Sequence, residues 1–174
     1  MRRAAGFTLI ELMITIAVVA VLLVLSVPTL RGVIENGRIR AAGESWKYGL
    51  TLARTEAVRR NAQVEFATGA GGWEVRLLPG GEVLHQAAGI EGAQRLDMTI
   101  LPEDATRVTY DSFGRVVNPS PVDGTEPIVQ IDIESTNPPT NDDRYHPLRL
   151  QVLAGGMTRL CDPKVAATDS RACL

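Results

Sequence analysis

Few side chains in this sequence could carry out a reaction. His85 falls within an expected strand and His146 precedes Pro147 in an expected loop, and neither has a serine or cysteine nucleophile near it in the sequence. The sequence contains no HExxH motif and no glycine loop of the phosphate-binding type. We therefore predict that the chain is not an enzyme and binds no cofactor.

Glu11 is the more unusual residue, because it lies inside a strongly apolar stretch. From Phe7 to Leu30 the chain is mostly hydrophobic, and Glu11 is its only charged residue. A helix over 7–30 would be about 36 Å long, enough to cross the core of a bilayer. A carboxylate at the centre of such a helix costs up to roughly 3 kcal/mol, which makes it a candidate functional group. The alternative is a plain anchor whose Glu11 lies near the headgroups and has no role.

The flanking residues predict the topology of this helix. Arg2 and Arg3 precede it, which predicts a cytoplasmic N-terminus and places everything after Leu30 outside. An ordinary secretory signal has its small-residue cleavage site after the apolar core, and 26–29 is a poor site of that kind. The small residue Gly6 instead stands before the core.

Gly6-Phe7-Thr8-Leu9-Ile10-Glu11 closely resembles the end of the class III leader of type IV prepilins and of type II secretion pseudopilins. The resemblance implies that a prepilin peptidase cuts after Gly6 and methylates the new terminal residue, Phe7. It implies that Glu11 pairs with the α-amine of Phe7 in an adjacent subunit, so that two costly groups compensate each other. It also matches Pro28 to the proline that bends the pilin helix. The implied partners are the peptidase, other major and minor pilins, and the bacterial inner membrane.

Cys161 and Cys173 lie close together near the end of the sequence. The predicted topology places them in an oxidising compartment, where such a pair usually forms a disulfide. Closing a 13-residue loop adds on the order of 3 kcal/mol in the chain-entropy model. A metal site is the weaker alternative, because two cysteines without nearby histidines supply only half of the ligands that such a site needs. Asn141-Asp142-Asp143 could bind calcium, although three adjacent polar residues more often form a solvated turn.

The segment 31–61 has the pattern of an amphipathic helix that continues the apolar one. Its apolar residues recur at steps of three and four: Ile39, Ala42, Trp46, Leu50, Ala53 and Ala57. We expect this face to pack on a sheet, which makes Trp46 a core residue rather than a binding site. Four glycines, at 32, 37, 43 and 49, each weaken a helix by roughly 1 kcal/mol, and with Pro28 they suggest a stalk that can bend or partly unwind.

The residues after 62 have the pattern of short strands and turns. Expected strands are 73–78 and 82–86 around a Pro-Gly-Gly turn, then 98–101, 107–110, 128–133, 148–152 and 157–161. A long helix followed by about seven strands predicts an α+β fold, with the helix packed on an antiparallel sheet. The predicted organisation is a cleaved leader at 1–6, a transmembrane helix at 7–30, its amphipathic continuation at 31–61 and a β-rich external domain at 62–174.

Three further segments resemble the minor pilins and minor pseudopilins of the GspH, FimT and FimU group. They are 52–61, which resembles the family's AR-EA--R signature, Phe113-Gly114-Arg115, and 156–163. The pilin-like fold agrees with this resemblance. The cysteine loop is more similar to the pilus members, which favours a structural minor pilin that primes or tips a type IV pilus. The alternative is a minor pseudopilin of type II secretion.

DNA binding in natural transformation is the other alternative. Some FimT-like pilins are implied to bind DNA through a Gly-Arg-x-Arg element, but here the first arginine is missing. Arg159, Lys164 and Arg171 remain as possible weak contacts. The region 61–174 holds nine basic and sixteen acidic residues, whereas phosphate binding draws on clustered Lys and Arg. We therefore expect DNA binding to be weak or absent.

Overall fold

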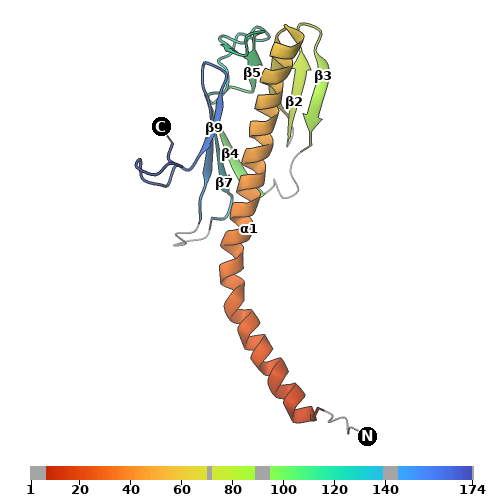
Figure 1. Cartoon of the computed structure of the whole chain (residues 1–174), viewed down its shortest axis with the longest axis vertical. Coiled ribbons are helices and arrows are strands. Elements are labelled where there is room, and N and C mark those ends of the chain that lie inside the picture. Colours follow the sequence, from red (N-terminus) through yellow and green to blue (C-terminus); the bar gives the residue numbers. More distant parts are fainter. Residues whose placement is uncertain (1–6, 70–71, 89–94, 139–144, 174) are drawn as a thin grey trace.

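The computed structural model describes residues 7–69, 72–88, 95–138 and 145–173, with the side chains of 24–31 excepted. A single helix, α1 (Leu9–Arg60), runs the whole length of the molecule (Figure 1). The hydroxyl of Thr8 caps its start by accepting a hydrogen bond from the N–H of Glu11 (3.3 Å). Asn61 ends it in the left-handed conformation, where its N–H reaches the carbonyls of Ala57 and Val58.

Five strands form sheet A, in the spatial order β3-β2-β1-β5-β6. They are β1 (Val64–Gly69), β2 (Gly72–Leu77), β3 (Glu82–Ala87), β5 (Arg107–Tyr110) and β6 (Val116–Val117). Every pairing is antiparallel. The central strand β1 follows the helix almost immediately, so the sheet begins under the end of α1.

Four strands form sheet B, in the order β4-β7-β8-β9. They are β4 (Leu96–Leu101), β7 (Gln130–Ser135), β8 (Leu148–Val152) and β9 (Thr158–Cys161), again all antiparallel. The segment before β7 joins the two sheets. The N–H of Ile128 bonds to Arg107 of sheet A (3.0 Å), while the carbonyl of Val129 accepts from Val152 of sheet B (2.9 Å).

The core lies between one face of α1 and the inner faces of both sheets. Trp46 is buried and makes an edge contact with Phe66, whose ring stacks in turn on Trp73. Gly49 lies directly over this aromatic group, since a Cβ there would stand 2.7 Å from the ring of Trp73. Gly43 meets Leu160 in the same way, at 3.0 Å. At these two positions glycine permits close packing of helix on sheet.

The expected α+β fold and the core position of Trp46 are confirmed. The expectation of one sheet with about seven strands was wrong, because the described residues form nine strands in two sheets. The strand expected at 128–133 starts at Gln130 and runs to Ser135. Its first two expected residues, Ile128 and Val129, bond to strands of different sheets and therefore form the crossing between them.

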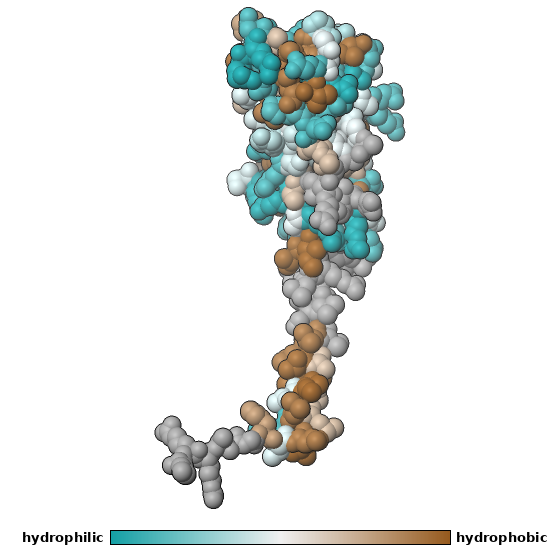
Figure 2. Space-filling model, turned by 90° about the vertical axis from the view of Figure 1, so that its right-hand side faces the viewer, coloured by the Kyte–Doolittle hydropathy of each residue, from teal (hydrophilic) through white to brown (hydrophobic). Residues whose placement is uncertain are grey.

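The lower part of α1 extends beyond the β-domain and curves (Figure 1). The described side chains over 9–23 are all exposed and, apart from Glu11 and Thr15, apolar, and Figure 2 shows much brown surface on this part of the molecule. Among the described residues, no helix combines the length and the hydropathy that a membrane span requires. The predicted span 7–30 includes residues 24–30, whose side chains lie outside the described set.

Candidate functional site

The first turn of α1 presents the residues that the leader motif singled out. Phe7 is 85% exposed, and Glu11 is exposed one turn further along. Within the part of the chain that the structure describes, the Glu11 carboxylate has no hydrogen-bond or ion-pair partner. Gly6 lies outside the described residues, and Pro28 lies within the helix with its side chain outside them. Among the described residues, this end of the molecule therefore presents an unpaired carboxylate on an apolar helix.

At the other end of α1, Arg54 ties the helix to both sheets. Its Nε donates to the carbonyl of Gly114, in the turn between β5 and β6 (2.9 Å). Gly156, in the turn between β8 and β9, packs against the same carbonyl, because a Cβ on Gly156 would lie 1.9 Å from that oxygen. The three segments that resembled the minor pilin group thus meet at one point. The sequence contained each segment but gave no sign that they touch.

Three basic side chains lie around Glu56 near the end of α1. Its carboxylate accepts hydrogen bonds from Arg59 (2.6 Å) and Arg60 (2.7 Å), and Nε2 of His85 lies 3.9 Å away. The hydrogen bonds from Arg59 and then Arg60 lower the pKa of Glu56 from 4.5 to about 2, although burial opposes them. His85 thus lies beside a carboxylate that anchors the end of the helix.

A disulfide joins Cys161, at the end of β9, to Cys173. A backbone hydrogen bond closes the loop between them, from the N–H of Asp162 to the carbonyl of Arg171 (2.8 Å). Arg159 extends from β9 and donates to the carbonyl of Ala172 (2.8 Å). The chain after β9 is therefore held as a compact loop at the edge of sheet B.

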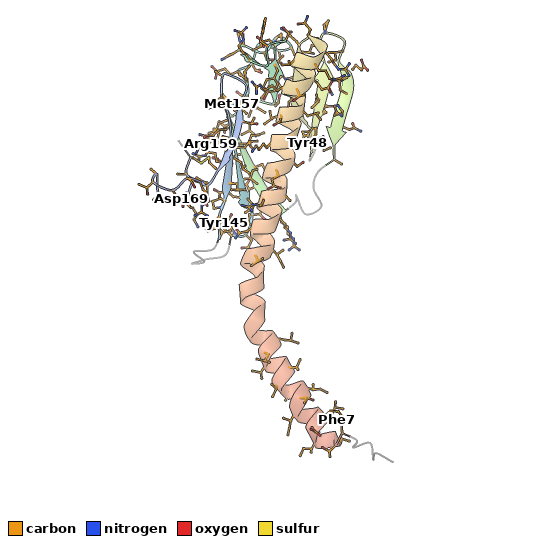
Figure 3. All side chains as sticks on the ribbon, viewed as in Figure 1. Phe7, Tyr48, Tyr145, Met157, Arg159 and Asp169 are labelled. Atoms are coloured by element: carbon orange, nitrogen blue, oxygen red, sulfur yellow. A yellow bond between two sulfur atoms is a disulfide. The ribbon has the colours of Figure 1, made fainter. Side chains whose placement is uncertain are left out.

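Intramolecular contacts engage all three possible DNA-binding residues. Besides Arg159, Lys164 donates to the carbonyl of Tyr145 (3.2 Å) and lies over its ring, and Arg171 pairs with Asp169 (2.8 Å). Figure 3 shows Arg159, Asp169 and Tyr145 spread along one side of sheet B.

A cavity of about 550 Å³ lies between α1 and the C-terminal loop, with His146, Asp162 and Ser170 among its lining residues. Nδ1 of His146 is 2.7 Å from the carboxylate of Asp162. Within the described chain, no serine hydroxyl hydrogen-bonds to His146, and the sulfur of Cys161 is part of the disulfide. The described residues also contain no group of three metal ligands, while 141–143 lie outside them. Among the described residues, the cavity thus places an imidazole beside a carboxylate but offers no activated nucleophile.

Comparison with known proteins agrees with these features. Residues 1–27 match the prokaryotic N-terminal methylation motif, and residues 42–156 match the family of the type II transport protein GspH. The type IV minor pilin FimU of Pseudomonas aeruginosa strain PAO1 has a similar structure, with a TM-score of 0.55 and 18% identity over 75% of this chain and 96% of FimU. The minor pseudopilin EpsH of the Vibrio cholerae type 2 secretion system is also similar in structure. Its TM-score is 0.50, with 16% identity over 74% of this chain and 99% of EpsH. A search of curated protein sequences found no significant match.

The GspH match covers more than half of the chain and includes Arg54, Glu56, Gly114 and Gly156. At their low identities, the solved structures establish the shared fold. The methylation motif coincides with the resemblance read from the leader, which is confirmed. The chain therefore belongs to the GspH family of minor pilins and minor pseudopilins, the structural subunits of type IV pili or type II secretion systems.

Proposed function

We propose that this chain is a structural minor pilin of a type IV pilus, which primes or tips the filament. A prepilin peptidase removes residues 1–6 and methylates Phe7. Residues 7–30 hold the chain in the bacterial inner membrane until assembly, with the helix to 61 and the β-rich domain from 62 to 174 on the outer side. Within the filament the helix packs among those of other major and minor pilins, and the chain contributes no catalysis.

The observation that carries this proposal is Glu11, whose carboxylate has no partner among the described residues and which lies on an apolar helix within the methylation motif. A carboxylate and an amine in an apolar environment are each unfavourable alone. When they face each other across two subunits, their attraction offsets much of the desolvation cost. Removal of the leader creates such an amine at Phe7. Processing and assembly are therefore linked through one charge pair.

The test is Glu11→Gln in the full chain, expressed in its own cells. We expect the variant to be cut and to remain in the membrane fraction, because the motif and the apolar helix are intact. Its amount in sheared filaments should fall at least tenfold, which corresponds to the loss of about 1.4 kcal/mol of subunit contact. Glu44→Gln is the matched control, since Glu44 is an exposed carboxylate on the same helix. Normal incorporation of Glu11→Gln would reject the charge pair.

The disulfide loop favours the pilus over the secretion system, because this feature resembles the pilus members of the group. Deletion of the gene separates the two functions. We expect surface filaments to become scarcer while type II secretion of a periplasmic substrate continues. Lost secretion with normal filaments would assign the chain to the pseudopilus. DNA binding gains no support from Arg159, Lys164 and Arg171, since each is engaged within the chain.

A further inference from the structure

Four large apolar side chains lie exposed at the end of the molecule farthest from Phe7. Val58 of α1, Phe113 of the β5–β6 turn, and Leu153 and Met157 of the β8–β9 turn are 52, 74, 45 and 60% exposed. In Figure 3, Met157 is the labelled residue farthest from Phe7. We call these four residues the distal apolar cluster. They surround the meeting point of Arg54, Gly114 and Gly156.

The turn that carries Phe113 is rigid. Oδ1 of Asp111 accepts hydrogen bonds from the N–H groups of Phe113 and Arg115 (both 2.9 Å). Oδ2 of Asp111 accepts two more from the Arg115 guanidinium (3.1 and 3.0 Å), which also lies 5.2 Å from the centre of the Phe113 ring. These contacts fix the turn while leaving most of the ring in solvent.

The second turn is locked to the first. Leu153 and Met157 close the β8–β9 turn with a backbone hydrogen bond (2.9 Å), and the N–H of Val116 bonds to the carbonyl of Ala154 (3.2 Å). Gly156 also packs closely against the carbonyl of Gly114, since a Cβ on Gly156 would stand 1.9 Å from that oxygen. Apolar groups held in place before binding lose little conformational entropy on binding, which strengthens association.

The charges beside the cluster favour one kind of partner. Arg59 follows Val58 and is 60% exposed in its side chain, and Arg115 is 65% exposed. Arg115 is paired with Asp111, but Arg59 and Arg60 share the single carboxylate of Glu56, which leaves this group of charges positive. A symmetric contact between two copies would bring two such positive groups together, which is unfavourable. Aromatic residues, methionine and arginine are enriched in protein interfaces relative to the rest of the surface. The complementary surface is therefore an apolar recess with carboxylates at its edge.

We propose that the distal apolar cluster docks the globular domain of a different subunit of the same filament, one whose recess is edged by carboxylates. This inference rests on the proposed function. It places a neighbour against the end of the domain that points away from the membrane anchor.

The experiment replaces Leu153 of the full chain, in its own cells, with the photocrosslinking residue p-benzoylphenylalanine. The position Val83 in β3, 45% exposed at the edge of sheet A, serves as the control site. Filaments are sheared after illumination, and adducts are identified by mass spectrometry. We expect a Leu153 adduct with a different mature pilin, one whose precursor has a prepilin leader, and a different or absent adduct at Val83. The pair Phe113→Ala and Met157→Ala should reduce the Leu153 adduct about tenfold, while Val83→Ala should leave it unchanged.

The outcomes separate this inference from the proposed function. If the chain is present in filaments but Leu153 crosslinks only to a second copy, to lipid or to nothing, the docking surface is wrong and the proposed function stands. An adduct that persists undiminished in the alanine pair would also overturn the docking surface. If the chain is absent from filaments altogether, the proposed function fails and this inference fails with it.

Discussion

Gly156 brings the β8–β9 turn into a contact with the carbonyl of Gly114 that no larger residue at position 156 would permit. A Cβ on Gly156 would stand 1.9 Å from the Gly114 carbonyl oxygen, and both glycines have positive φ, at 81° and 74°. From the sequence alone, these glycines are turn residues. Their partners in space are about 40 positions away in the chain, and so the closeness of the contact could not be predicted.

We predict that Gly156→Ala destabilises the domain by at least about 2 kcal/mol, through backbone strain together with the clash. The measurement is urea unfolding of the full chain in detergent. Gly155→Ala is the control, because a Cβ at that neighbouring position meets nothing within 4 Å, and its effect should stay within about 0.5 kcal/mol. Equal stability of the two variants would contradict the glycine contact.

The lowered pKa of Glu56 predicts that the free energy of unfolding depends on pH. Its pKa is about 2 in the folded chain, mainly through hydrogen bonds from Arg59 and Arg60, against 4.5 ordinarily. A depressed pKa contributes stability that is present above pH 4.5 and is lost as the pH falls towards 2. Glu56→Gln should therefore lower stability at pH 6 and flatten the decline between pH 4.5 and 2.

Urea unfolding at several pH values checks this prediction for Glu56. Glu126→Gln is the matched control, because Glu126 is exposed. We expect its free energy of unfolding to vary with pH as it does in the unaltered chain. An undiminished decline in Glu56→Gln would show that other carboxylates produce it.

At the scale of elements, local patterns predicted most of the fold. The apolar face of α1 and its end near Asn61 follow from residue spacing, and the β2–β3 hairpin follows from its Pro-Gly-Gly turn. The division into two sheets did not follow, because it depends on Ile128 and Val129 bonding in opposite directions. Such long-range pairing leaves no periodic signal. The glycines at 43 and 49 likewise look like helix weaknesses until the sheet beneath them is known.

The C-terminal loop is the element whose stability depends on a covalent bond. Cys161→Ser with Cys173→Ser should lower the free energy of unfolding by about 3 kcal/mol, since the disulfide restricts the unfolded chain. Urea unfolding of the full chain, oxidised and reduced, gives the same comparison without mutation. Ser170→Ala, within the same loop, should have little effect. If the disulfide made no difference to unfolding, the hydrogen bonds from Arg159 and Asp162 would be sufficient to stabilise the loop.

At the scale of the whole molecule, the structure separates two surfaces along one axis. An apolar helix end with a single carboxylate lies at one end, and a folded domain with a rigid apolar cluster lies at the other (Figures 1 and 2). The leader motif is contiguous, so the sequence alone indicated the first surface. The second depends on three segments that only folding brings together. A subunit with different contacts at its two ends suits an open filament rather than a closed oligomer.

The most direct test is the mass of the N-terminal peptide of the chain recovered from sheared filaments. The account predicts a peptide that begins at Phe7 and carries one added methyl group on its amine. In the proposed charge pair, this terminus supplies the amine that faces Glu11 of a neighbouring subunit. A chain that retains residues 1–6, or one released from the membrane and missing from filaments, would contradict the account.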